Sequence, residues 1–244
     1  MGRSSGRVTE LVVPVPASDD RWVLEEEDMP ETPLHQRIID LLVLVLSAWI
    51  ARSGRDAMAG SNIALRWNRA KPSTGVDPDV YLVEPAPPEG EATKSLCLWK
   101  QGHHAPRVAI EVVSAETAGK DYRDGPARYA ASGVRELWVF DPLRLGPDDG
   151  GGPWVLQVWR RVKGRQFVLV HAGDAPAFSR ELGAWVVVTD GGTRLRIADD
   201  AAGAKLWPTA EEEERRGREA AEREVERLRA ELKRPQAKRP PRKS

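Results

Sequence analysis

Cysteine is nearly absent from this sequence, since Cys97 is the only one among 244 residues. A single thiol excludes a disulfide within the chain and a metal site built from several cysteines. The first six residues, from Met1 to Gly6, also lack the apolar stretch of a signal peptide. Together these two features predict a cytoplasmic protein.

An excess of charge of either sign is also missing. Lys and Arg together number 37, as do Asp and Glu, so the formal net charge is zero. Composition alone therefore does not indicate a strongly basic nucleic-acid binder. The end of the chain differs, because residues 233–244 contain six basic side chains and no acidic one. Such a tail either contacts phosphates without sequence preference or keeps the chain end soluble.

Long apolar runs are scarce as well. The longest, residues 38–51, contains Asp40 and is shorter than the roughly 20 residues that span a bilayer. We therefore expect a buried helix over residues 35–52, ended by Gly54, and no membrane partner.

The apolar content of 41% is enough for one sizeable core. We predict a flexible N-terminus over residues 1–20, a folded domain over 21–208, a charged helix over 209–232 and a basic disordered tail over 233–244. Within the charged helix, apolar residues recur at the spacing of a short heptad seam: Ala221, Val225, Leu228 and Leu232. Two interpretations stay open, a solvated helix and a dimerising coiled coil.

Alternating and apolar runs predict a mixed sheet flanked by helices. A second helix is expected at residues 121–132, between two apolar strands, and this order is typical of a crossover unit. Two hairpins are expected near the end of the domain, each with a Gly-containing turn. The predicted strands are 63–67, 80–83, 96–99, 107–114, 136–142, 154–160, 166–171, 185–188 and 194–197.

Two carboxylates stand in runs that otherwise predict buried strands. Asp79 precedes the apolar run at 80–83, and Glu111 lies between Ile110 and Val112. Burying a carboxylate is costly unless a partner compensates its charge. A divalent cation is such a partner, and two carboxylates from adjacent strands suit Mg²⁺. The pattern favours metal-dependent cleavage of phosphodiester bonds.

The ordered set of motifs from Asp79 to Pro142 resembles the Uma2 family, a branch of the PD-(D/E)xK restriction-endonuclease-like nucleases. The matching segments are Pro78-Asp79-Val80, residues 110–114 with Thr117 and Asp121, Tyr129, Gly133-Val134 and residues 136–142. Pro33-Leu34-His35 also resembles the start of that family. The resemblance covers roughly residues 20–175.

The resemblance implies an α/β restriction-endonuclease-like core and a Mg²⁺-dependent endonuclease that hydrolyses DNA. Asp79 and Glu111 would hold Mg²⁺, for which Mn²⁺ can substitute, with the Val112 carbonyl as a third oxygen ligand. His35 would line the site and contact substrate. A second copy of the chain is also an expected partner, in a homodimer formed through the core or the C-terminal helix.

One position departs from the family. The general pattern has Lys two residues after the second acid, where this chain has Val113, and the Uma2 family usually supplies it from the next helix, where this chain has Gly125. We expect Lys120 to replace it as the catalytic cation, because a lysine side chain reaches about 6 Å. Lys100 and Arg123 are weaker candidates for contacting substrate.

The missing lysine leaves a second interpretation open. The chain can instead be a catalytically impaired nuclease fold that serves as a DNA-binding or protein-interaction module. Glu116 and Asp121 have two interpretations as well, as acids that support the site or as charges favoured at a helix N-terminus.

Overall fold

The computed structural model describes residues 12–14, 32–148, 152–162 and 166–233. The chain divides into two compact units, Met1–Trp207 and Pro208–Ser244. Each is described by itself.

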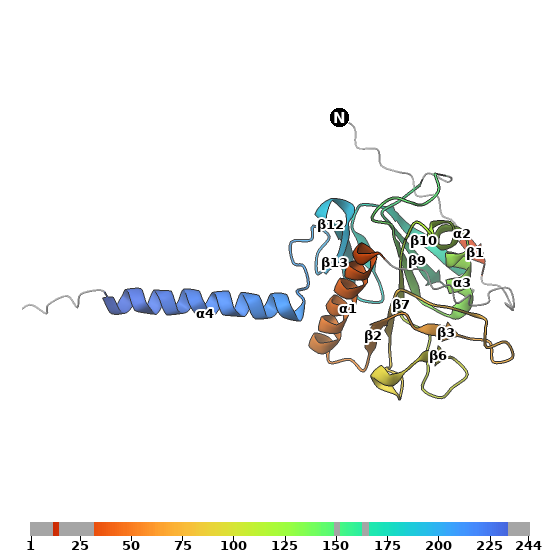
Figure 1. The fold of residues 1–244 in the computed structure, drawn as a ribbon, viewed down its shortest axis with the longest axis horizontal. Helices are drawn as coiled ribbons and strands as arrows, with labels where there is room; N and C mark the ends of the chain where they lie inside the picture. Colours follow the sequence, from red (N-terminus) through yellow and green to blue (C-terminus); the bar gives the residue numbers. More distant parts are fainter. Residues whose placement is uncertain (1–11, 15–31, 149–151, 163–165, 234–244) are drawn as a thin grey trace, which may run out of the picture. The chain divides into compact units, whose positions relative to one another are not determined.

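A seven-stranded sheet forms the centre of the first unit (Figure 1). β7 and β8 run parallel, and every other neighbouring pair in this sheet is antiparallel. In spatial order the strands are β1 (Val12–Pro14), β10 (Gln166–Gly173), β9 (Leu156–Val162), β8 (Glu136–Phe140), β7 (Val108–Val112), β5 (Val80–Val83) and β2 (Met58–Ser61). The fold is thus the predicted α/β class with a mixed sheet, and β1 lies inside the segment predicted to be flexible.

The parallel pair β7–β8 is joined by a crossover, as predicted, but the connection contains two short helices. These are α2 (Ala118–Arg123) and α3 (Gly125–Ser132), which meet at Asp124. The prediction of one helix over 121–132 is wrong, because Pro126 at the second position of α3 has no N–H to donate to the preceding turn. Gly133, in the left-handed conformation with φ 91°, ends α3.

The long helix α1 (Pro33–Ser53) covers one face of the sheet. Thr32 caps its start, since Thr32 Oγ1 accepts the His35 N–H at 3.2 Å, and Gly54 ends it. With 21 residues, α1 is longer than the predicted apolar run, and its length and composition alone would allow it to cross a membrane. Its apolar side chains nevertheless pack as those of a core helix do: Ile38, Ile39, Leu42, Val45, Leu46 and Trp49 are buried in one cluster with strands of the sheet.

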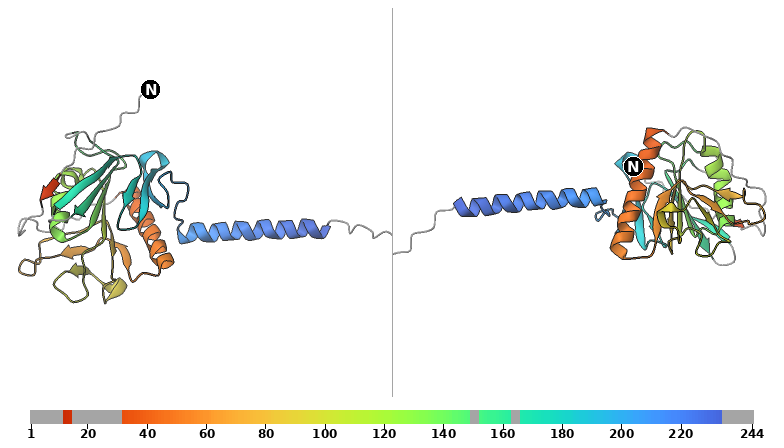
Figure 2. Two further views of the ribbon diagram at one scale, coloured as in Figure 1. Left: turned by 180° about the vertical axis from the view of Figure 1, so that it is seen from behind. Right: turned by 60° about the horizontal axis from the view of Figure 1, so that its bottom comes forward.

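Two three-stranded sheets complete the unit (Figure 2). One joins β4 (Gly75–Val76), β3 (Ala64–Arg66) and β6 (Ser95–Cys97), and the other joins β11 (Ala177–Ser179), β12 (Ala184–Thr189) and β13 (Arg194–Ala198). Short 3₁₀ turns, η1 (Gly90–Ala92) and η3 (Asp190–Gly192), lie beside them. β4 falls in a segment predicted to be loop, because two residues are too few to give a periodic signal.

Side chains on the two faces of the central sheet build two separate apolar clusters. Val108, Ile110 and Val112 of β7 point into the cluster that contains α1 and the β11–β13 sheet. Ala109 and the residue after the strand, Val113, belong to the cluster that contains α3 and the β3–β4–β6 sheet. Since side chains alternate along a strand, Glu111 is placed on the second face.

The second unit contains α4 (Ala210–Lys233). Thr209 and Glu212 form a capping box at its start, with Thr209 N donating to Glu212 Oε2 at 2.9 Å and Glu212 N donating to Thr209 Oγ1 at 3.2 Å. Val225 and Leu228 of the predicted seam are each 46% exposed. The basic tail after Lys233 lies outside the described residues, and both interpretations of the seam remain predictions.

Candidate active site

Asp79 and Glu111 come from neighbouring strands of the central sheet. β5 and β7 pair antiparallel, with Val80 opposite Ile110 and Tyr81 opposite Ala109. Extending this register by one residue places Asp79 opposite Glu111, on the face that carries α2 and α3. The two acids that the sequence singled out, 32 positions apart, therefore meet at one end of the sheet.

Both carboxylates are held by donors from the surrounding fold. Asp79 Oδ2 accepts the backbone N–H of Val112 at 2.6 Å. Glu111 Oε1 accepts a hydrogen bond from the hydroxyl of Tyr129, a buried residue of α3. Burial, followed by the charge of Glu111, raises the pKa of Tyr129 well above its usual range, so the hydroxyl stays protonated and donates. These contacts fix the direction in which each carboxylate points.

His35 lies against the same two strands. Its Nε2 donates to the Val112 carbonyl oxygen at 2.8 Å and lies 3.4 Å from Asp79 Oδ2. Donation to a carbonyl requires the proton to sit on Nε2, which fixes the tautomer. The Val112 oxygen has a second lone pair in addition to the one that accepts this bond. The first turn of α1 thus brings His35 beside Asp79 and Val112.

Two further acids lie close enough to act on this pair electrostatically. Burial, with a contribution from the charge of Asp79, raises the pKa of Asp121 to about 7. Burial and then the charges of Asp79 and Asp121 raise the pKa of Glu111 well above its ordinary value. Partial burial and the charge of Asp79 also raise the pKa of Asp77, at the rim. Burial is the largest cause in each case, so these carboxyls lie in surroundings that favour their protonated forms.

Lys120 is the positive charge that α2 brings to this cluster. It is exposed at the surface, and its charge lowers the pKa values of Glu111, Asp121 and Asp77 against the other effects. Arg123 is exposed near the end of the same short helix. Lys120 therefore acts electrostatically on the site acids, and its predicted catalytic role stays a prediction; Arg123 follows one turn further on.

Lys100 lies elsewhere. It follows β6 in a turn where its N–H donates to the Cys97 carbonyl oxygen at 2.8 Å, and its charge contributes to lowering the pKa of Glu89. The structure therefore associates this lysine with a different carboxylate from those around Glu111.

The position of α2 is set by Tyr122, which the sequence did not single out. Its hydroxyl oxygen lies 2.9 Å from both Asp141 Oδ2 and the Trp154 carbonyl oxygen, and it accepts the Trp154 N–H at 3.2 Å. Asp141 is fully buried after β8. This network fastens α2, and with it Lys120 and Asp121, to the end of the central sheet.

The oxygen atoms at the site suit a hard divalent cation. Within the described residues, no group of three or more His, Cys, Asp or Glu side chains converges as a metal-binding cluster. Mg²⁺ keeps several of its waters and is bound through one or two carboxylates. The position of Asp79 opposite Glu111, with the Val112 carbonyl oxygen beside them, is the observation that favours such a cation.

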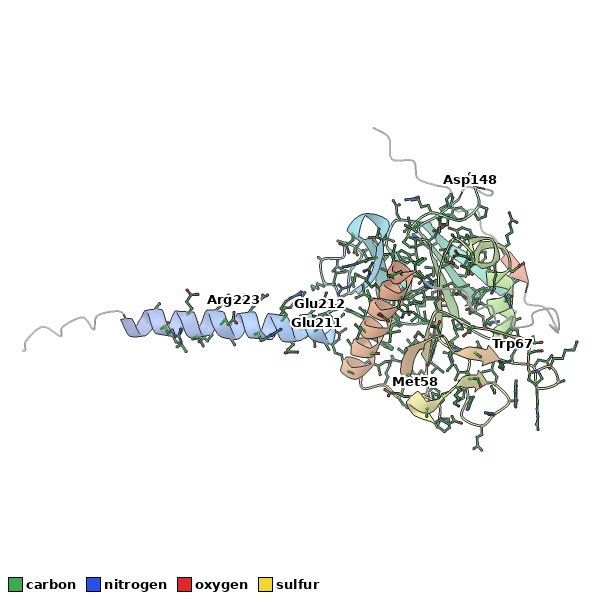
Figure 3. The ribbon with its side chains drawn as sticks, in the orientation of Figure 1. Met58, Trp67, Asp148, Glu211, Glu212 and Arg223 are labelled. Atoms are coloured by element: carbon green, nitrogen blue, oxygen red, sulfur yellow. The ribbon has the colours of Figure 1, made fainter. Side chains whose placement is uncertain are left out.

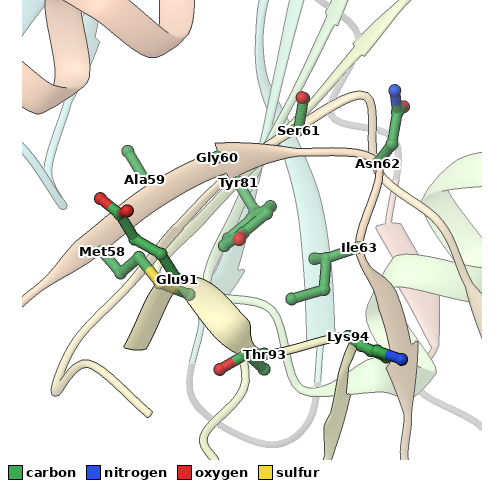
Figure 4. Close-up of a pocket in the computed structure, with 10 residues that line it drawn as sticks. All are labelled: Met58, Ala59, Gly60, Ser61, Asn62, Ile63, Tyr81, Glu91, Thr93 and Lys94. Atoms are coloured by element: carbon green, nitrogen blue, oxygen red, sulfur yellow. The ribbon is translucent and has the colours of Figure 1, made fainter. Parts of the chain in front are cut away.

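A surface pocket lies along β2 (Figure 4). Its volume is about 470 Å³, and Asn62, which lines it, donates its N–H to the Asp79 carbonyl oxygen at 3.3 Å. The other lining residues come from β2, β5 and the η1–β6 segment: Met58, Ala59, Gly60, Ser61, Ile63, Tyr81, Glu91, Thr93 and Lys94. Neither Asp79 nor Glu111 lines this pocket, so it is distinct from the candidate site.

Comparison with known proteins places the chain in a family. The model of the family Uma2, described as "Putative restriction endonuclease", matches residues 23–173. The chain belongs to the Uma2 family. This assignment supports a nuclease, and so a hydrolase that acts on nucleic acid, and restriction-endonuclease-like proteins generally use divalent metals. A search of curated proteins found no match.

A solved structure similar to this Uma2 protein is that of a "putative nuclease belonging to DUF820" from Anabaena variabilis ATCC 29413. The two are 16% identical, with a TM-score of 0.42, and the alignment covers 64% of this chain and 76% of the other.

The structure also places at the candidate site residues to which the sequence assigned no role. Tyr129 was part of the family pattern without a role, and it donates to Glu111. Asp77 was passed over, although the pair of acids on either side of Pro78 was a usable signal. Of the two acids with open interpretations, Asp121 is buried beside the site, whereas Glu116 is exposed.

Asp121 leads to a prediction about stability and pH. Its pKa of about 7 in the folded protein lies above its ordinary value of 3.8, so the folded state holds more protons between these values. The free energy of unfolding of the metal-free protein should therefore fall as the pH rises from about 4 to about 7. Glu111 acts in the same direction, so Asp121→Asn should remove only part of the decline.

Urea unfolding at pH 5 and pH 8 in the presence of EDTA would measure this decline. Asp124→Asn, at an exposed position on the same connection, is the matched control and should leave the difference unchanged. An Asp121→Asn protein with the full wild-type difference would contradict the prediction.

Proposed function

We propose that this Uma2 protein is a Mg²⁺-dependent endonuclease that hydrolyses phosphodiester bonds in DNA. The observation that carries the proposal is the position of Asp79 opposite Glu111, with the Val112 carbonyl oxygen beside them. Asp79, Glu111 and the Val112 carbonyl would hold the cation. When bound, Mg²⁺ supplies Lewis-acid chemistry that activates water and neutralises charge on the phosphate.

The protein's own residues have separate tasks in this proposal. Tyr129 orients the Glu111 carboxylate through its hydrogen bond. Lys120 stabilises the negative charge that develops on the scissile phosphate in the transition state. Arg123 and His35 contact the substrate next to it, and Lys100 is a more distant candidate for such a contact. Asp121 lies buried beside these groups, where burial raises its pKa to about 7 in the metal-free protein.

Cleavage of plasmid DNA tests the proposal directly. Wild-type protein with Mg²⁺ is expected to convert supercoiled plasmid into nicked or linear forms, and Mn²⁺ should substitute. EDTA should stop the reaction, and renewed addition of Mg²⁺ should restore it. Agarose gels over time measure the conversion, and an RNA substrate run in parallel tests the preference for DNA. Absence of cleavage of either substrate with both metals would overturn the proposal.

A second function is favoured by one specific residue. Gly125 occupies the position where the Uma2 family usually has its lysine, so the chain can be a catalytically impaired nuclease fold that acts as a DNA-binding or protein-interaction module. Binding of DNA without any cleavage in the same assay would support this alternative. A cytoplasmic location stays a prediction under both functions.

The proposal includes a homodimer. One route is the core, and the other is α4, on which Val225 and Leu228 are exposed between charged residues. A seam of barely two heptads is short for an independent coiled coil.

A further inference from the structure

The turn between β3 and β4 carries basic side chains and no acidic one. No acidic residue occurs from Ala57 to Val76, whereas Arg66, Arg69 and Lys71 all fall within this stretch. Arg69 and Lys71 are exposed. We call residues 66–74 the basic turn. In a chain whose net charge is zero, this is a local concentration of cations.

Hydrogen bonds give the basic turn a defined conformation. Asn68 Oδ1 accepts the backbone N–H groups of Ala70 at 3.0 Å and of Lys71 at 3.2 Å. The guanidinium of Arg66 donates across the turn to the Pro72 carbonyl oxygen. The turn therefore presents its exposed cations from a fixed backbone, which reduces the entropy lost on binding a ligand.

The base of the basic turn is anchored beside the candidate active site. Trp67 packs against the apolar cluster that contains α3, and its position is labelled in Figure 3. From α3, Arg128 Nη2 donates to the Gly75 carbonyl oxygen at 3.5 Å, where β4 begins. In Figures 1 and 2 the turn projects on the side of the sheet that carries α3. After β4 the chain continues directly to Asp77 and Asp79.

Positive side chains approach the acids from two elements. Arg66, at the start of the basic turn, lies opposite Gly75 in the β3–β4 pair, two residues before Asp77. Lys120 lies on α2, next to the buried Asp121. A polyanion bound at the acids would therefore meet positive charge from two segments of the chain.

We propose that the basic turn binds the sugar–phosphate backbone of the nucleic acid next to the point of cleavage, through Arg69 and Lys71. This inference rests on the proposed nuclease function and adds the surface that holds the substrate. Phosphates repeat about every 3.4 Å along the axis of one DNA strand, so those flanking the scissile phosphate extend beyond the acids. Contacts to phosphate carry no sequence information, so this surface binds DNA irrespective of its sequence.

The test is the salt dependence of DNA binding by the full chain. Anisotropy of a labelled duplex, measured in EDTA so that no cleavage occurs, gives the binding constant at several salt concentrations. Arg69→Ala/Lys71→Ala should weaken binding and lower the slope of log K against log salt by about 2, which is about 1 for each phosphate that the variant no longer neutralises. The turn itself should persist, because the bonds to Asn68 come from backbone N–H groups. Arg69→Lys/Lys71→Arg should keep the wild-type slope.

A matched pair controls for net charge. Arg194→Ala/Lys205→Ala removes the same charge from exposed positions in and after β13, and it should leave the slope unchanged. Equal losses in both double variants, or a wild-type slope in Arg69→Ala/Lys71→Ala, would overturn the role of the basic turn.

The plasmid assay separates this inference from the proposed function. If wild type binds DNA through the basic turn but cleaves nothing, the nuclease proposal fails and the binding surface stands. If wild type cleaves DNA and the Arg69→Ala/Lys71→Ala protein keeps its KM and salt slope, the basic turn alone is wrong. A wild-type protein that neither binds nor cleaves nucleic acid overturns both.

Discussion

Glu111→Gln is expected to lower the rate of Mg²⁺-dependent cleavage by about 10³-fold or more, equivalent to roughly 4 kcal/mol. The substitution removes the negative charge that would hold the cation but keeps the size of the side chain and an oxygen that can accept from Tyr129. The fold should therefore survive. Without a buried carboxyl whose pKa is raised, the metal-free variant should be at least as stable as wild type at pH 8.

Cleavage rates, circular dichroism and thermal unfolding together measure this outcome. Glu116→Gln is the matched control, because it makes the same chemical change at an exposed position near the start of α2, and it should keep full activity. An active Glu111→Gln protein would show that Glu111 does not hold the metal.

Lys120→Ala is expected to lower the turnover by about 10²–10³-fold, the usual effect of losing one stabilising charge at the transition state. Mn²⁺ binding, measured by calorimetry, should persist, because the carboxylates and the Val112 carbonyl remain. Lys205→Ala is the control, because that lysine is exposed after β13 and has no part in the proposed site. Full activity of Lys120→Ala would refute the assignment and direct attention to Arg123.

Gly125→Lys extends the same test by returning the cation to its usual place in the family. A Cβ at position 125 would meet only the Lys120 carbonyl oxygen, at 3.6 Å, which is an ordinary contact. Gly125→Lys should therefore partly restore the activity of Lys120→Ala. If wild type is inert and Gly125→Lys alone gives activity, the natural protein is an impaired nuclease.

The central elements of the fold could be predicted because their signals are local. β7 and β8 are apolar runs, and the crossover between them follows from their order along the chain. The division into α2 and α3 was not predicted. The pattern over 121–132 was given more weight than Gly125 and Pro126, the two residues that interrupt a helix. The strands β4 and β1 are two and three residues long, so they depend on partners far away in sequence rather than on a pattern of their own.

Only part of the candidate site could be predicted, because several of its contacts join residues that are far apart in the chain. Asp79 and Glu111 stood out because each is an acid beside or within an apolar strand. The contact between His35 and Val112 joins residues 77 positions apart, and the effect of Lys120 on Asp77 depends on how α2 docks on the sheet. Such relations arise from tertiary packing, which local sequence patterns do not encode.

The stacking of Trp207 on Trp49 has a further consequence, because the ribosome synthesises Trp207 long after α1. The two rings lie parallel within 9°, with centroids 6.2 Å apart, and the β11–β13 sheet covers the same cluster around α1. At about 5–20 residues per second, α1 emerges roughly 8–30 seconds before Trp207 does. During that interval the nascent chain therefore leaves exposed the part of α1 that Trp207 and the β11–β13 sheet cover in the folded protein.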